Sequence, residues 1–406
     1  MEYYTHQLKN GIRLAHVPVE SEIAYCGMMI HTGTRDEEPS EHGIAHFIEH
    51  MLFKGTKKRK PFHILSRMED VGGEINAYTT KEETCIYASC LKTDYSRAIE
   101  LISDVLIRST FPEKEMGREK EVIIDEINSY KDSPGELIFD DFEELIFPDH
   151  PIGRNILGSP ESVKAFTRKQ VYDFIGKNYN TDEMVFCSVG NISFSQLKKY
   201  FEKYFSEIPS NFRKKKRVQE LEYHPVNKEV KMDTWQTHYL LGTTAYNALD
   251  DRRVGLYLLN NILGGQGLNS RLNMSLREKN GYAYNIESSY NPYFDTGVLS
   301  IYFGTDGNNL SKSIRIANNE LRKLRSTKLG FVQLHKAQRQ MVGQLARGRE
   351  SHESLMFSLG KSILLFNQFE STEETNRKIE AVNADELMEV ANEMLAQGRL
   401  SSLTYK

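Results

Sequence analysis

The sequence holds few cysteines for its length. Among 406 residues there are four, Cys26, Cys85, Cys90 and Cys187. No two of them have the C-x-x-C spacing of a thiolate zinc site, and a chain of this size does not depend on a disulfide frame. We therefore expect reduced thiols in a cytoplasmic protein, most of them packed in the core.

Long apolar runs and a surplus of basic charge are also missing. No window of about 18 apolar residues occurs, and residues 1–17 lack a basic segment followed by an apolar one. We therefore expect a cytoplasmic protein without a membrane partner, unless a targeting segment has been removed. The net charge of −4 provides no basic excess to displace counterions, so nucleic acid is not an expected partner either.

The composition is that of a globular protein with more than one core. Hydrophobic residues make up 39% of the chain and charged residues 27%, a balance typical of folded domains. A length of 406 residues exceeds what one ordinary core organises, so we expect two domains.

The most informative stretch is His46-Phe47-Ile48-Glu49-His50. Two histidines four residues apart fall on one face of an α-helix, so both imidazoles can reach the same metal ion. Glu49 lies near that face, where it can hold a water molecule. The remaining positions are apolar, as a helix packed against a core requires.

This H-x-x-E-H pattern is the inverted form of the zinc-protease motif H-E-x-x-H. From 12 histidines and 56 acidic residues, chance produces it roughly 0.05 times per chain. The motif is therefore suggestive and not decisive. The alternative is a helix with two incidental histidines.

The segments after the motif favour an alternation of helices and strands. We expect helices at 61–71, 94–109 and 112–131, and strands at 72–80 and 83–90. Asn76 and Ala77 lie in the first of these strands, which could approach a ligand or form an ordinary hairpin edge. Glu119 and Glu126 share one face of the helix 112–131, so at least one is expected to point at the core.

The composition changes near the middle of the chain. The basic run 213–217, flanked by prolines, predicts a solvated linker, with a phosphate or membrane patch as the alternative. We therefore expect a metal-binding domain over 1–212, a linker over 213–227 and a second domain over 228–406.

The second half repeats the order of helices and strands of the first, with a period of about 200 residues. It carries no H-x-x-E-H, which indicates a duplicated pair with one metal site. Its Gly264-Gly265-Gln266-Gly267 loop lacks the ending of a phosphate-binding P-loop, so we do not assign it that role.

Four segments together resemble the pitrilysin/insulinase-type zinc peptidases, or inverzincins. They are GIAHFIEHMLFKGT, GGEINAYTTKEET, REKEVIIDEI and GGQGLNSRLNMSLREKNGYAY, and they occur in the family's order over residues 43–284. The subgroup that the chain is most similar to contains the mitochondrial processing peptidase β subunit and bacterial homodimeric relatives.

The resemblance implies one Zn²⁺ per chain, with His46, His50 and Glu126 as ligands. Glu126 lies 76 residues after His50, an interval that the family shares. Glu49 then corresponds to the general base that takes a proton from water. Glu119 corresponds to a second carboxylate that acts indirectly, by orienting a ligand or assisting water.

The resemblance also implies residues that bind the peptide. Arg277 and Tyr284 correspond to the pair that holds the substrate carbonyl and the developing oxyanion. Asn76 and Ala77 would bind the peptide by strand addition, through main-chain hydrogen bonds.

The implied fold is α+β, with two duplicated halves of mostly antiparallel sheet packed with helices. Two chains would pair into a clam-shell chamber that admits unfolded oligopeptides, and each site would combine the zinc of one chain with Arg277 and Tyr284 of the other. We therefore expect a homodimeric zinc metalloendopeptidase.

Two alternatives stay open. One is a non-catalytic scaffold or peptide-binding subunit of the same fold, which the presence of Glu49 disfavours. The other is a heterodimer that needs a missing partner, which the presence of Arg277 and Tyr284 weakens. The acidic run 36–38 fits either a preference for basic peptides or a solvated loop.

Overall fold

The computed structural model describes residues 2–214, 217 and 222–406. Residues 215–216 and 218–221 of the expected linker lie outside the described residues. The chain forms two compact units, each assembled from three segments. Unit 1 comprises 1–128, 154–216 and 347–371, and unit 2 comprises 129–153, 217–346 and 372–406.

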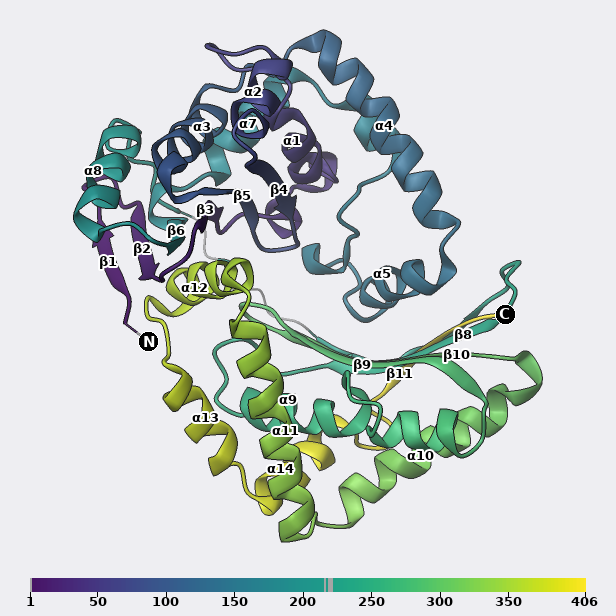
Figure 1. Cartoon of the computed structure of the whole chain (residues 1–406). Coiled ribbons are helices and arrows are strands. Elements are labelled where there is room, and N and C mark those ends of the chain that lie inside the picture. The colour runs from purple at the N-terminus through teal and green to yellow at the C-terminus, as the bar shows by residue number, and fades with distance from the viewer. Residues whose placement is uncertain (1, 215–216, 218–221) are drawn as a thin grey trace. The chain divides into compact units, whose positions relative to one another are not determined.

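Unit 1 is built on a six-stranded sheet in the order β1-β2-β6-β3-β5-β4 (Figure 1). All neighbours are antiparallel except β2 and β6. Its strands are β1 (Tyr4–Gln7), β2 (Arg13–Pro18), β3 (Ile23–Ile30), β4 (Glu74–Thr79), β5 (Thr84–Leu91) and β6 (Met184–Gly190). The strand β4 is therefore an edge strand, with one side open to pairing.

Helices cover both faces of this sheet. One face packs against α1, α3 and α8, and the other packs against α12. The helices of unit 1 are α1 (Ile44–Leu52), α2 (Pro61–Glu69), α3 (Tyr95–Arg108), α4 (Glu113–Lys131, whose last turn belongs to unit 2), α6 (Pro160–Ala165), α7 (Arg168–Asn178), α8 (Phe194–Phe205) and α12 (His352–Phe366). All four cysteines are free and buried, as expected.

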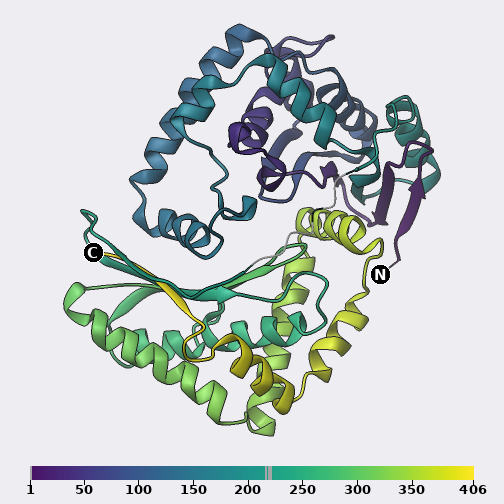
Figure 2. The same cartoon turned by 180° about the vertical axis from the view of Figure 1, so that it is seen from behind.

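Unit 2 has a five-stranded sheet in the order β7-β11-β8-β10-β9. Its strands are β7 (Asn227–Val230), β8 (Thr237–Thr244), β9 (Ala283–Pro292), β10 (Gly297–Thr305) and β11 (Ser401–Tyr405). Figure 2 shows α5 on one face of this sheet and α9, α10 and α11 on the other. Its helices are α5 (Pro134–Ile146), α9 (Arg253–Gly264), α10 (Leu310–Ser326), α11 (Phe331–Arg349, whose last residues belong to unit 1), α13 (Thr372–Ala381), α14 (Ala384–Met394) and the π-helical turn η6 (Asn273–Glu278).

The two sheets share one topology, which confirms the predicted duplication. If the strands of each repeat are numbered along the chain from β2 and from β7, both sheets have the order 1-5-2-4-3. In both, the first and last strands are parallel and the remaining neighbours are antiparallel. The α+β architecture of two helix-packed, mostly antiparallel sheets is therefore as expected.

The two compact units are not an N-terminal and a C-terminal half of the chain, because each contains a helix from the other half of the sequence. The helix α5 precedes the expected linker, yet Ile138 and Phe142 pack with Leu240 in unit 2. The helix α12 lies near the C-terminus, yet Leu359 packs with Val185 in unit 1. Each helix thus buries its apolar face on the sheet of the other half of the sequence.

The start of the basic run is also not solvated as expected. Arg213 is partly buried, and its guanidinium lies 3.1 Å from a carboxylate oxygen of Asp36. Its main-chain N–H donates to the carboxylate of Asp182. These contacts fix the end of the second segment of unit 1.

None of the helices in the described ranges combines the length and the apolar character that crossing a membrane requires.

Candidate metal centre

The helix α1 begins at a position where no side chain can cap it. Gly43 has φ +91°, and a Cβ there would lie 2.7 Å from the Cα of Gly158. The cap comes instead from Glu37, which is 3% exposed and accepts hydrogen bonds of 2.9 Å from the amides of Gly43 and Ala45. Arg154 donates to the main-chain oxygen of Glu37. Three hydrogen bonds thereby fix the first turn of the helix.

Glu37 positions the helix that carries the two histidines, a role that the sequence pattern did not reveal. It is buried, so neither interpretation of the acidic run 36–38, a solvated loop or a site for basic peptides, applies to it. Burial raises the pKa of Glu37 to about 8, while the two amides and Arg154 oppose that rise.

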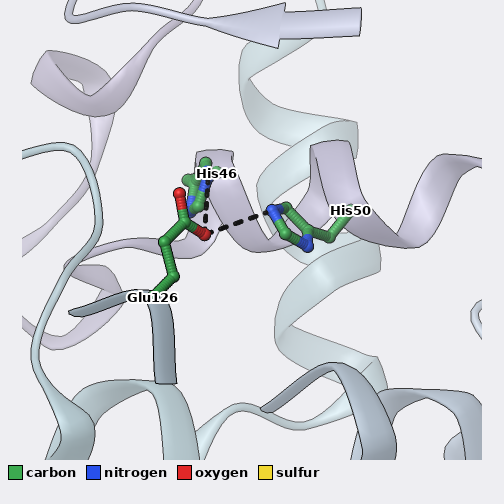
Figure 3. A group of neighbouring side chains, drawn as sticks. All are labelled: His46, His50 and Glu126. Atoms are coloured by element: carbon green, nitrogen blue, oxygen red, sulfur yellow. Dashed lines mark ion pairs between the residues drawn. The ribbon is translucent and has the colours of Figure 1, made fainter. Parts of the chain in front are cut away.

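Two histidines and one glutamate meet at the face of α1 that the motif predicted. Nε2 of His46 lies 3.9 Å from Oε2 of Glu126, and Nε2 of His50 lies 3.6 Å from the same oxygen (Figure 3). One ligand atom from each residue lies within 4.8 Å of the others. In the described part of the chain this is the one cluster of His, Cys, Asp and Glu with such spacing.

The chemistry of this cluster fits a zinc ion. Two imidazoles and one carboxylate form the donor set of a catalytic zinc site, which keeps a further position for water. Burial, and then the nearby His50, lowers the pKa of His46 to about 3, so its ring stays neutral. Its Nδ1 is buried and has no hydrogen-bond partner in the described part of the chain. A neutral imidazole is the form in which histidine binds a metal.

Glu119 is buried behind His50. Its Oε2 lies 3.3 Å from Nδ1 of His50, and its Oε1 lies 2.6 Å from Nζ of Lys54. A carboxylate at the second nitrogen of a histidine fixes the orientation of the ring. Of Glu119 and Glu126 on α4, Glu119 is the one that points inward, whereas the side chain of Glu126 is 44% exposed. Lys54 was not predicted, because nothing in its spacing marks it as the partner of Glu119.

The edge strand β4 ends beside Glu49. Burial raises the pKa of Glu49, and the adjacent Thr79, the last residue of β4, and His50 oppose the rise. Earlier in the strand, the N–H of Ala77 donates to Oδ1 of Asn76 at 2.8 Å. That N–H therefore becomes available at the edge once the Asn76 side chain releases it.

Arg277 and Tyr284 belong to unit 2. Arg277 lies in η6 with its side chain 42% exposed, and Tyr284 is 75% exposed in β9. Tyr284 lines a pocket of about 820 Å³, together with Tyr130, Gly135, Glu136, Phe139, Asn285, Ile286, Glu287, Ser289, Asn291 and Tyr302. The cluster in unit 1 thus contains His46, Glu49, His50, Glu119 and Glu126, while this pair stands in the other unit.

The buried His46 predicts how stability depends on pH in the metal-free chain. An unfolded histidine takes up a proton near pH 6.5, whereas the folded state keeps His46 neutral down to about pH 3. The unfolded state therefore binds more protons in this window, and the free energy of unfolding falls as pH falls. His46→Gln should lessen that loss by about 1.4 kcal/mol per pH unit.

The measurement is urea denaturation from pH 7 to pH 4.5, with His63→Gln, which replaces an exposed histidine of α2, as the matched control. Equal slopes for the native chain and His46→Gln would contradict the assignment of His46 as a buried neutral ring.

The cap on α1 gives a second prediction. Glu37→Gln sets an N–H₂ donor against one of two amide donors, so the metal-free chain should lose about 1–3 kcal/mol of unfolding free energy. Zinc affinity, measured by chelator competition, should fall as well, because the first turn carries His46. Glu38→Gln is the control, since it removes an exposed pair with Lys177 and should cost less than about 1 kcal/mol. Unchanged zinc affinity in Glu37→Gln would refute the link between cap and ligand.

Two family models match most of the chain. Residues 16–160 match Insulinase (Peptidase family M16), and residues 165–341 match the Peptidase M16 inactive domain. Among solved structures, a peptidase M16 inactive domain from Pseudomonas fluorescens has a TM-score of 0.93 at 19% identity, over 100% of this chain and 98% of that one. A protease from Helicobacter pylori has a TM-score of 0.92 at 20% identity, over 100% and 99%. At these identities the likeness shows the fold alone.

Curated relatives extend the match over nearly the full length. The uncharacterized zinc protease YmxG of Bacillus subtilis is 33% identical over 97% of this chain and 95% of its own. An uncharacterized zinc protease of Rickettsia bellii is 30% identical over 98% of this chain and 96% of its own. With these matches and the zinc-type donor set of unit 1, the chain belongs to the insulinase family of zinc peptidases, peptidase family M16.

Proposed function

We propose that the chain is a zinc-dependent endopeptidase that hydrolyses unfolded oligopeptides. The observation that carries the proposal is that His46 and His50 of α1 meet Glu126 of α4. Glu49 lies between the two histidines on α1. A zinc site with a structural role has no use for a carboxylate that can move a proton. The family and the names of the relatives support zinc and protease activity.

Glu49 is the general base of the proposed reaction. Zinc held by His46, His50 and Glu126 supplies Lewis-acid activation of water near neutral pH. The carboxylate of Glu49 takes the proton of the attacking water and later gives it to the leaving amine. Burial raises the pKa of Glu49, which makes its carboxylate a better proton acceptor. Glu119, held by Lys54, orients the ring of His50.

The edge of β4 supports binding of an extended peptide. The open side of the strand offers main-chain donors and acceptors to a substrate strand, and the N–H of Ala77 is one of them. Asn76 must first release that N–H, so its side chain can report on substrate binding. A peptide must be unfolded to pair in this way, which supports selection against folded proteins.

Arg277 and Tyr284 are proposed to bind the substrate carbonyl and the developing negative charge. Both side chains are substantially exposed, and a guanidinium and a phenol are suitable donors to an oxyanion. We propose a homodimer with a closed chamber, in which each site combines the zinc of one chain with Arg277 and Tyr284 of a second copy. The free, buried cysteines favour the cytoplasm as the compartment.

The pocket around Tyr284 supports a preference for basic peptides. Glu136 and Glu287 are its two charged lining residues, and neither has a cationic partner among the residues that the structure describes. An exposed carboxylate pair in a pocket attracts lysine or arginine side chains of a ligand.

The catalytic proposal predicts the behaviour of Glu49→Gln. The variant should keep one zinc per chain and lose hydrolysis of a quenched, unstructured peptide by at least about 10²-fold, because the proton acceptor is gone. Glu69→Gln, an exposed substitution on α2, is the control and should retain activity. Full activity in Glu49→Gln would exclude the proposed base. A zinc-loaded native chain without any hydrolysis would favour the scaffold or peptide-binding alternative.

The proposed preference for basic peptides predicts a loss of kcat/KM that is confined to such peptides. The double variant Glu136→Gln/Glu287→Gln should lower kcat/KM about ten-fold for peptides with arginine or lysine, relative to matched neutral peptides. Cleavage of the two peptide sets is compared with that by Glu389→Gln, an exposed control on α14. An equal effect on both sets would argue that the pocket does not select peptides by their charge.

A further inference from the structure

A pocket in unit 2 is lined by α9 and α11, the helices that correspond in the repeated topology to the two that carry the metal cluster of unit 1. In the repeated topology α9 follows β8 as α1 follows β3, and α11 follows α10 as α4 follows α3. Matching the buried pair Leu258-Leu259 with Phe47-Ile48 sets Asn260-Asn261 at the positions of Glu49-His50. The counterpart in unit 2 therefore has amides where unit 1 has a base and a ligand.

The pocket is basic and amide-rich. It has a volume of about 600 Å³ and is lined by Asn261, Ile262, Asn269, Ser270, Arg271, Leu329, Gln333, Lys336, Ala337, Arg339 and Gln340. Three of these side chains are cationic, four are amides, and none of these lining residues is acidic. The electrostatic character is thus the reverse of that of the carboxylate-bearing cluster in unit 1.

Several donors in this pocket have no acceptor. The side chain of Arg271 is 24% exposed, and its nearest carboxylate, on Glu320, is 3.9 Å away, too far for a hydrogen bond. Nδ2 of Asn261 is buried and has no hydrogen-bond partner among the residues that the structure describes. Lys336 and Arg339 have no ion-pair partner within the described ranges of the chain. Asn261 and Arg271 are partly buried, so a donor left without an acceptor is costly there, and an acceptor-rich ligand removes that cost. Lys336 and Arg339 are exposed and add positive charge to the lining.

The glycine-rich loop that follows α9 leads into Asn269, Ser270 and Arg271, which line the pocket. A side chain at Gly267 would collide with the amide of Gln340, which also hydrogen-bonds Asn269 at 3.1 Å. The loop therefore contacts α11 through the side chain of Gln340, and residues of both segments line the pocket. The loop acts here through close packing and not as a P-loop.

We propose that this pocket of unit 2 binds an oxyanion group, a phosphate or a carboxylate, through Arg271, Lys336, Arg339 and the amide of Asn261. Charge-assisted hydrogen bonds from guanidinium and ammonium groups are the strongest that side chains offer to such a ligand. The volume exceeds that of a single ion, so a small molecule or a peptide end that carries the group fits as well. None of its lining residues belongs to the peptidase site proposed above.

The test measures binding to the full-length, zinc-loaded chain by isothermal titration. The probes are inorganic phosphate and one short peptide prepared with a free and with an amidated C-terminus, the peptides on a Glu49→Gln background to prevent turnover. Arg271→Gln and Lys336→Gln should each weaken binding of the anion about ten-fold with zinc content unchanged. Arg322→Gln, an exposed arginine of α10 outside the pocket, should have no effect.

The arms distinguish the source of the anion. Binding of the free but not the amidated peptide identifies a peptide carboxylate, and binding of phosphate alone identifies a phosphate ligand; either outcome supports the site. Absence of saturable binding by every probe, or binding that both substitutions leave intact, would overturn it. Lys336 is exposed, so Lys336→Gln decides the matter if Arg271→Gln does not fold. No step requires hydrolysis, so an inactive chain would leave this test valid.

Discussion

Burial of α1 imposes the constraint on which the metal centre depends. Seven of its nine residues are buried, so its first amides cannot donate to water and need acceptors within the fold. Glu37 accepts from two of them, and Gly43 and Gly158 allow the chain segments to come together. The same burial keeps His46 neutral. The position of His46 therefore depends on the burial of α1 and on the cap that Glu37 provides.

Duplication gave the chain two copies of one topology that have diverged in chemistry. Unit 1 keeps imidazoles and carboxylates between α1 and α4. The corresponding place in unit 2 holds amides and cations between α9 and α11. The shared backbone accommodates both, because the sheet and the helix pair set where the side chains meet and not which groups they carry. The description of the second matched domain as inactive agrees with the finding that, among the described residues, the one cluster of three metal-binding side chains lies in unit 1.

The sequence predicted the parts of this centre that lie within one helix. The spacing of His46 and His50 places both on one face, and the structure confirms it. Glu126 comes from another helix, so periodicity alone could not select it over Glu119, and the family resemblance was needed. Glu37 could not be found, because it lies outside the helix and its role depends on how the preceding loop folds back onto Gly43, six residues later.

Tertiary packing also limited what could be predicted of the fold. The residues Ile138, Phe142 and Ile146 recur at helical spacing in α5 and form an apolar face, but such a pattern does not say which sheet will bury that face. Its packing on unit 2, and that of α12 on unit 1, follows from which sheet has an uncovered apolar side. Local periodicity contains no information on such pairings over long separations.

The central claim is that His46, His50 and Glu126 hold zinc in a nitrogen and oxygen environment. X-ray absorption at the zinc edge of the purified chain tests it most directly. The account predicts one zinc per chain with two imidazoles and additional oxygen neighbours at about 2.0–2.2 Å, and loss of one imidazole in His50→Gln. Sulfur neighbours at about 2.3 Å, or a zinc environment unchanged by His50→Gln, would contradict it.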